Sequence, residues 1–193
     1  MLGNLVVIII SMVLVNNYPL AQFLGICPFL GVSKDLDSAK GMGWAVVFVM
    51  VVATAATWPL QQVLNHFGIG YLQTVVFILV IAFLVQLIEM FMKKSMPALY
   101  TALGVYLPLI TTNCTVLGVC ISNIDNNYGY IESLVNAFGA GLGYLFGMLL
   151  MAGVRTKLVD EENFPSPFRG FPIVLVTAAI MSLGFMGFSG MFS

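Results

Sequence analysis

Long apolar runs constrain this chain more than any other feature of its sequence. A helix that crosses the hydrocarbon core of a bilayer needs about 20 apolar residues, and four segments reach that length: 41–64, 69–92, 134–154 and 171–192. Hydrophobic residues make up 60% of the 193 residues and charged residues only 8%, whereas a water-soluble domain carries roughly 25% charged residues. The sequence therefore predicts an all-α integral membrane protein.

Two further apolar segments, residues 2–15 and 97–110, are short for a full crossing. Each is followed by a polar break, NNYP at residues 16–19 and TTN at residues 111–113, after which the chain is apolar again. Irregular backbone at membrane depth is tolerated only where protein or a cavity covers its polar groups. We therefore predict six transmembrane helices, of which the first and fourth are discontinuous, with functional residues near the breaks.

The basic residues support six crossings, because cytoplasmic loops carry an excess of Lys and Arg. Six crossings place every basic residue on one side of the membrane: Lys34, Lys40, Lys93, Lys94, Arg155, Lys157 and Arg169. Both termini are then expected on the outer side of the cytoplasmic membrane. The net charge of −1 leaves no clustered basic surface, so nucleic acid is not an expected partner.

A short internal repeat accompanies the two breaks. The motif C-x-x-L-G-V begins at Cys27 and again at Cys114, 87 residues later. Three predicted helices separate the two starts, and an odd number of crossings inverts orientation. We therefore predict a single membrane domain, 1–193, built from two inverted three-helix repeats at approximately 1–95 and 96–193, in which interrupted helices meet near the bilayer midplane.

Cys27 and Cys114 are the candidate metal ligands, because a pseudo-two-fold axis would bring their thiols together. Thiolates suit iron-sulfur clusters, zinc or copper(I), and Gly25, Gly31 and Gly118 would let the backbone approach closely and donate hydrogen bonds to sulfur. Two ligands are not four, so a four-cysteine cluster would need two from another polypeptide. The alternative interpretation is that both cysteines are small buried hydrophobes.

Other polar residues carry weaker hypotheses. Cys120 has Ser33 as its counterpart in the repeat and is interpreted as a packing residue. Glu89 lies inside the third predicted helix, where an ionisable group is costly and suggests function. Lys93 is available four residues later as an interfacial ion-pair partner, and a cation relay is the alternative. His66 is interpreted as a solvated residue of an external turn.

Glycines at 139, 143 and 147 recur every four residues in the fifth predicted helix, a pattern that predicts close helix approach. The chain has no Walker A loop, no dinucleotide fingerprint and no triad arrangement. No nucleotide or flavin site of its own is therefore predicted.

Four blocks of sequence resemble one known family. They are FLGICPFLGVSK at residues 23–34, LVQLIEM at 84–90, LPLITTNC at 107–114 and SLGFMGFSG at 182–190. In order and spacing they resemble the RnfA-type subunits of Rnf ion-translocating ferredoxin:NAD oxidoreductase complexes, in the NqrDE/RnfAE family and similar to NqrE. The resemblance extends over nearly the whole chain.

The resemblance implies a set of partners and a cofactor. It implies a sister subunit, RnfE, in inverted orientation, with each subunit giving two cysteines to an iron-sulfur cluster, expected to be 2Fe-2S, between them. The matching residues here are Cys27 and Cys114, and Cys120 matches no ligand of the family. It further implies that electrons pass from cytoplasmic iron-sulfur subunits to a flavin subunit on the outer face of a prokaryotic inner membrane, with export of Na⁺ or H⁺. The chain itself would hold no flavin and no complete active site.

Two other classes of function are compatible with the same sequence. Inverted repeats and broken helices are also typical of secondary transporters and ion channels. A passive membrane scaffold for redox partners, with inert cysteines, is the third interpretation. Iron in the assembled complex would distinguish the first interpretation from the other two.

Overall fold

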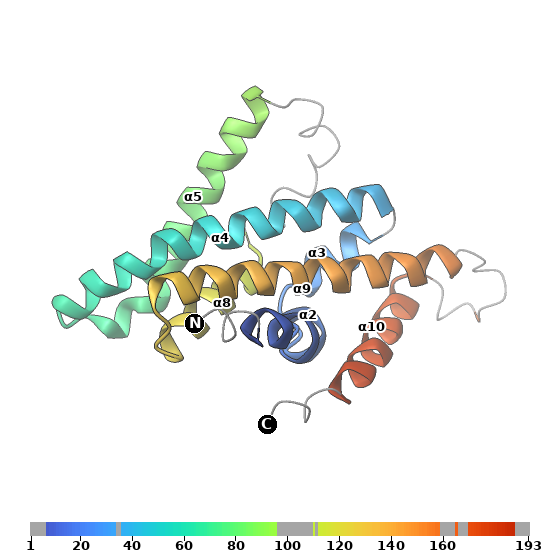
Figure 1. The fold of residues 1–193 in the computed structure, drawn as a ribbon. Coiled ribbons are helices and arrows are strands. Elements are labelled where there is room, and N and C mark those ends of the chain that lie inside the picture. The colour runs from blue at the N-terminus through green and yellow to red at the C-terminus, as the bar shows by residue number, and fades with distance from the viewer. Residues whose placement is uncertain are drawn as a thin grey trace.

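The computed structural model describes residues 7–33, 36–95, 110, 112–158, 165 and 170–187, and the regular elements in this part of the chain are all helical. Figure 1 shows their arrangement. The elements are η1 (Ser11–Val15), α2 (Tyr18–Ala21), α3 (Ile26–Val32), α4 (Leu36–His66), η2 (Gly70–Leu72), α5 (Gln73–Ser95), α8 (Cys114–Asp125), α9 (Tyr130–Lys157) and α10 (Phe171–Met186).

Three helices are long and apolar enough to cross a membrane: α4, residues 70–90 including most of α5, and α9. They coincide with the predicted spans at 41–64, 69–92 and 134–154. The predicted span at 171–192 is represented by α10, which has 16 residues, and its last residues lie outside the described part of the chain. Most of the predicted segment 97–110 also lies outside it, so six crossings remain a prediction.

Helices α4 and α9 form the centre of the molecule and run antiparallel, side by side in Figure 1. Val47, in the first half of α4, contacts Gly141 of α9, where an added Cβ would lie 3.0 Å from the Val47 Cα. Trp58, near the end of α4, packs edge-on against Tyr130 at the start of α9, with ring centroids 5.3 Å apart. The small glycine allows close backbone contact, which provides much of the packing energy between membrane helices.

The first helical segment is interrupted where the sequence places its break. A π-helical turn, η1, ends at Val15, and the Asn16 N–H donates to the Ser11 carbonyl at 2.8 Å. The short helix α2 follows, with Pro19 in its first turn, where a missing N–H costs nothing. A second turn then leads into α3. The chain thus enters α3 from irregular backbone, of which Gln22 and Phe23 are exposed and Gly25 is buried.

The broken segment packs against glycines of α9. An added Cβ on Gly139 would lie 3.2 Å from the Ile9 Cα, and one on Gly143 would lie 2.8 Å from the Met12 carbonyl oxygen. An added Cβ on Gly147 would lie 3.5 Å from the Leu20 Cδ1. This contact confirms the packing role predicted for these glycines.

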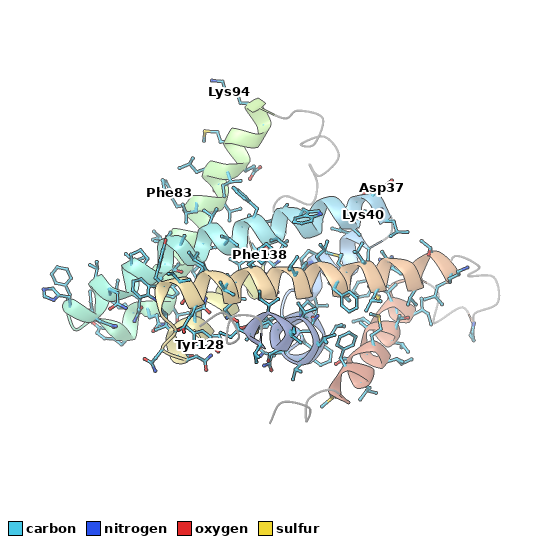
Figure 2. The ribbon with its side chains drawn as sticks, in the orientation of Figure 1. Asp37, Lys40, Phe83, Lys94, Tyr128 and Phe138 are labelled. Atoms are coloured by element: carbon cyan, nitrogen blue, oxygen red, sulfur yellow. The ribbon has the colours of Figure 1, made fainter. Side chains whose placement is uncertain are left out.

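Helix α5 diverges from the central pair at a steep angle (Figure 1). Only 17% of its apolar span is buried within the chain, and large side chains such as Leu79 and Phe83 are exposed (Figure 2). Apolar exposure of this extent is the expected state of a helix that faces lipid or another membrane protein.

The described basic residues lie at helix ends. Lys40 is near the start of α4, and Arg155 and Lys157 are in the last turn of the antiparallel α9. Figure 2 shows Lys40 and Asp37, which form an ion pair at 3.8 Å, far from Tyr128 at the opposite end of the pair. The end of the α4–α9 pair that carries Lys40 and Lys157 is called the basic end below.

Candidate functional site: two cysteine-bearing turns

Cys27 and Cys114 each lie in the first turn of a helix that follows a break. Cys27 is the second residue of α3 and Cys114 is the first residue of α8. Both side chains are exposed on the surface of this chain. The first turn of a helix leaves backbone N–H groups without intrahelical partners, so the two breaks place thiols beside available donors.

The two turns touch each other at Gly25. Gly25 precedes α3 with φ of +74°, and an added Cβ would lie 2.6 Å from the Asn113 Oδ1 and would also collide with the Thr115 Oγ1. Asn113 and Thr115 are the residues on either side of Cys114. The residue two positions before Cys27 therefore packs directly against the turn that carries Cys114. Gly25 was predicted to allow a close approach of the backbone; the approach seen here is to the Cys114 turn, and hydrogen bonding to sulfur stays a prediction.

Tyr144 of α9 ties the two turns to the central pair. Its hydroxyl donates to the Gly25 carbonyl oxygen at 3.2 Å and is completely buried. An added Cβ on Gly25 would lie 3.0 Å from the Tyr144 ring, so the ring also packs against this turn. Asn113 in turn caps α8, because its Oδ1 accepts from the Thr115 N–H at 3.0 Å. Tyr144 thus holds the turn before Cys27 against α9, and Gly25 of that turn packs against the residues beside Cys114.

Arg155 holds the other end of α3. Its Nη1 donates to the Leu30 carbonyl oxygen at 2.6 Å and to the Ser33 Oγ at 2.9 Å. A cation at the C-terminal end of a helix satisfies carbonyls that lack intrahelical partners. Cys27 therefore sits on a short helix that is anchored at both ends by α9.

Asn17 donates hydrogen bonds to backbone carbonyls at the first break. It is completely buried, and its Nδ2 donates to the Gly143 carbonyl oxygen at 2.8 Å and to the Val13 carbonyl oxygen at 3.1 Å. The sequence predicted a break at this position but not how its polar groups are satisfied. The roles of Tyr144 and Arg155 were also missed, because their partners lie 119 to 125 residues away and no local pattern marks such contacts.

The remaining candidates lie apart from the two turns. Cys120 is buried in α8, with its Sγ 3.8 Å from the Thr54 Oγ1. Glu89 is half-buried in α5 and borders a small apolar cavity between α4 and α5. Lys93 is exposed near the end of the same helix. His66 is exposed at the end of α4, where its ring packs edge-on against Phe67.

Within the described residues, no group of three or more His, Cys, Asp or Glu side chains is placed to hold a metal ion. Two buried donors beside Cys114, the Asn113 Nδ2 and the Thr115 Oγ1, have no hydrogen-bond partner. Two exposed thiols with spare donors behind them are compatible with part of a thiolate-bound metal site. This part of the chain does not offer a complete one.

The fold and the site define a class of protein: a helical membrane protein in which two cysteine-bearing turns pack against each other. The chain belongs to the Rnf-Nqr family of membrane protein subunits, whose family model matches residues 5–192. The resemblance to RnfA-type subunits is therefore confirmed.

Relatives match over nearly their full lengths. The chain is 55% identical over 189 residues to the A-type subunit of the Na(+)-translocating ferredoxin:NAD(+) oxidoreductase complex of Acetobacterium woodii, covering 97% of this chain and 98% of that protein. It is 54% identical to the corresponding subunit of the ion-translocating oxidoreductase complex of Syntrophotalea carbinolica, covering 97% of each chain. The corresponding subunit of Vibrio campbellii is 48% identical over 96% of this chain and 97% of its own length.

Proposed function

We propose that this chain relays electrons across the membrane within an Rnf-type ion-translocating oxidoreductase, through an iron-sulfur cluster shared with a homologous sister subunit. The carrying observation is that the Cys27 and Cys114 turns meet at Gly25 while both thiols remain exposed. The relatives are subunits of ion-translocating oxidoreductase complexes by name, which supports assembly into such a complex.

The role of the chain's own residues follows from their placement. A 2Fe-2S cluster, when bound, would accept and release single electrons, and its potential depends on burial and on hydrogen bonds to sulfur. Cys27 and Cys114 would bind iron as thiolates. Gly25 and Tyr144 hold the two turns at a fixed separation, and the bundle behind them excludes water. No acid-base residue is needed for electron transfer.

The sister subunit would complete the ligand set. A cluster with four cysteine ligands needs two more thiolates than these turns provide, and both thiols lie on the surface, where another chain can approach. A homologous subunit in inverted orientation would present the same pair of turns. The partners then include RnfE, the iron-sulfur and flavin subunits, and membrane lipid.

The inverted repeat is part of the same proposal. Cys27 and Cys114 each lie in the first turn of a helix that follows irregular backbone, and α4 packs antiparallel to α9, as a pseudo-two-fold axis in the membrane plane requires. Six crossings would place both termini on the outer side of a prokaryotic inner membrane. The complex would export Na⁺ or H⁺ as electrons pass.

The alternative is a secondary transporter or ion-channel subunit. The observation that favours it is the broken first helix with a buried asparagine at the break, a backbone typical of transporters. Transport without a redox centre requires no iron, so the two functions are separated by the metal content of the complex.

The test compares three single substitutions in the assembled complex: Cys27→Ser, Cys114→Ser and, as the matched control, Cys120→Ser. Serine offers a harder and normally protonated oxygen in place of thiolate. We expect the first two variants to lose the iron and the paramagnetic signal of this cluster and its electron flux, while Cys120→Ser retains them. A Cys114→Ser complex with full iron and flux would overturn the ligand assignment.

A further inference from the structure

A ladder of buried polar side chains runs along the interface of α4, α8 and α9, away from the two cysteine-bearing turns. Its members have side chains that are no more than 4% exposed: Thr54, Thr57, Gln61, Asn123, Ser133 and Asn136. In α4 and in α9 these residues are three or four apart, which places them on one face of each helix, and α8 contributes Asn123 alone. Buried polar groups at membrane depth are costly and mark function by default.

The inner end of the ladder is a pair of asparagines. The Asn136 Nδ2 donates to the Asn123 Oδ1 at 2.6 Å, and the Asn123 Nδ2 donates to the Ser133 carbonyl oxygen at 3.4 Å. The Asn136 Oδ1 is left without a hydrogen-bond partner although its residue is completely buried. An acceptor oxygen in this state is available to a cation or to a donor from outside the chain.

The outer end of the ladder is Gln61. Its Nε2 donates to the Asn65 Oδ1 at 3.0 Å, and its Oε1 is also a buried acceptor without a partner. Gln61 lines a partly open cavity of about 240 Å³, whose wall includes Trp58, Asn65 and Tyr128. The ladder therefore begins at a polar opening. It ends at Thr54 and Asn136, roughly 10 Å further along α4 at a rise of about 1.5 Å per residue.

The opening lies at the end of the α4–α9 pair opposite the basic end (Figure 2). Two exposed carboxylates, Asp125 and Glu132, flank it at the end of α8 and the start of α9. The described Lys and Arg residues lie in the first turns of α4 or the last turns of α5 and α9, and none lies at this opening. The wall of the cavity is uncharged, and the two nearby carboxylates give its surroundings a negative charge that raises the local concentration of cations.

We propose that this ladder binds a monovalent cation of the Na⁺ type, which enters at Gln61 and is held at Asn136. The proposal rests on the proposed function, because it assigns a site to the exported ion. Hard cations bind oxygen ligands, and both unpartnered groups are amide oxygens. The hydroxyl of Thr57 donates to the Ala53 carbonyl oxygen at 2.8 Å, which leaves its lone pairs for a cation.

The neutral character of the ladder sets its selectivity. The described residues of its interior include no carboxylate, so only oxygen dipoles would stabilise a bound cation, and a divalent ion would bring twice the uncompensated charge of a monovalent one. The six side chains of the ladder carry only hydroxyl and amide groups, which neither gain nor lose a proton near neutral pH. Oxygen dipoles alone suit a monovalent metal ion.

The test measures Na⁺ binding to the purified complex without electron flow, as the rise in melting temperature with NaCl against choline chloride at constant ionic strength. Asn136→Leu replaces the amide with an apolar group of similar size, and Thr57→Val removes one hydroxyl. Thr177→Val is the matched control, because the Thr177 hydroxyl makes the same 2.8 Å bond to a carbonyl four residues earlier, outside the ladder. Only Asn136→Leu and Thr57→Val should weaken Na⁺ binding.

The expected concentration of Na⁺ for half-maximal stabilisation rises about tenfold in Asn136→Leu and about threefold in Thr57→Val, as for the loss of one ligand. It stays unchanged in Thr177→Val. The proposal is overturned if choline stabilises the parent as much as Na⁺ does, or if Thr57→Val responds to Na⁺ as the parent does. If Asn136→Leu does not assemble, the Thr57→Val comparison is the deciding test. Iron content measured on the same samples tests the electron relay separately.

Discussion

Gly25 is held in place by two independent constraints, and they can be separated experimentally. Its φ of +74° is a left-handed conformation, and its Cα faces Asn113 and Thr115 with no room for a side chain. The left-handed conformation costs an alanine about 1–2 kcal/mol, and a clash in a packed interior typically adds about 1–3 kcal/mol. A methyl group at position 25 would also push the two cysteine-bearing turns apart.

We therefore expect Gly25→Ala to destabilise this chain and to reduce the iron content of the assembled complex. Gly68→Ala is the control, because Gly68 has φ of +70° with no atom within contact distance of an added Cβ. The measurements are the melting temperature and the iron per complex. Equal effects of the two substitutions would show that the contact between the turns is unimportant.

Tyr144 offers a second test at the scale of one hydrogen bond. Tyr144→Phe keeps the ring and removes the hydroxyl, which leaves the Gly25 carbonyl oxygen without its donor, at a cost of about 1–3 kcal/mol. We expect iron to be retained, with a shifted midpoint potential and a broadened paramagnetic spectrum. Tyr71→Phe, at a tyrosine that is 82% exposed, should change neither, and a parent-like spectrum in Tyr144→Phe would contradict a positioning role.

At the residue scale, the residues of the repeated motif were predictable from the sequence, and the residues that act through distant contacts were not. Cys27 and Cys114 are marked by the two copies of one motif and by the breaks before them, and Gly25 by its place two residues before the first copy. Tyr144 and Arg155 act through contacts with residues far away in the sequence. No local sequence pattern distinguishes them from other buried tyrosines or other arginines at helix ends. Their roles required the packing of α9 against the broken segment.

Among the elements, the glycine face of α9 determines where the broken first segment lies. An added Cβ at Gly143 would meet the Met12 carbonyl oxygen at 2.8 Å and the Asn17 Nδ2 at 3.4 Å. A larger side chain would displace the break and remove the bond from Asn17 to the Gly143 carbonyl oxygen. The covering of the irregular backbone depends on this contact.

Gly143→Val is accordingly expected to lower the stability of the chain by about 1–3 kcal/mol or more and to impair assembly. Gly153→Val is the control in the same helix, because nothing lies within 4 Å of an added Cβ there and the change in helix propensity is the same. Melting temperatures and the yield of assembled complex in membranes measure both. A Gly153→Val effect as large as that of Gly143→Val would contradict the packing argument.

The long helices were predictable because each has one dominant requirement, an apolar run that matches the bilayer thickness. The π-helical turn of η1 and the short helix α2 were not, since their geometry is decided by what covers them. The sequence indicated a break at residues 16–19, and the structure supplies its cover in Asn17 and the α9 glycines.

For the whole molecule, the antiparallel pairing of α4 and α9 makes orientation testable with two positions on one helix. Glu132 and Lys157 are both exposed and lie at opposite ends of α9. With the basic end on the cytoplasmic side, we expect a reporter at Glu132 to react with an impermeant reagent from outside. A reporter at Lys157 should react only from the cytoplasm, and the reverse pattern would contradict both the topology and the outward position of the proposed cation opening.

The exposure of both ligand thiols has its main consequence at the scale of the assembly. A thiolate-bound cluster on the surface of one chain would be open to lipid and oxidants, and the described residues of this chain provide no further ligands to close it. In the proposed assembly, burial between two subunits would supply both the missing thiolates and the exclusion of water on which the potential depends.

We therefore expect this chain, purified by itself, to bind less than a stoichiometric amount of iron-sulfur cluster, and co-expression with the sister subunit to restore it. The measurement is iron and acid-labile sulfide per polypeptide, with the paramagnetic spectrum of the reduced sample. Co-expression with a sister subunit whose two motif cysteines are replaced by serine is the control, because it keeps the interface and removes only the ligands. That control pair should assemble without a cluster, whereas a complete cluster in it, or in the monomeric chain alone, would mean that ligands other than Cys27, Cys114 and the partner's thiols hold the iron.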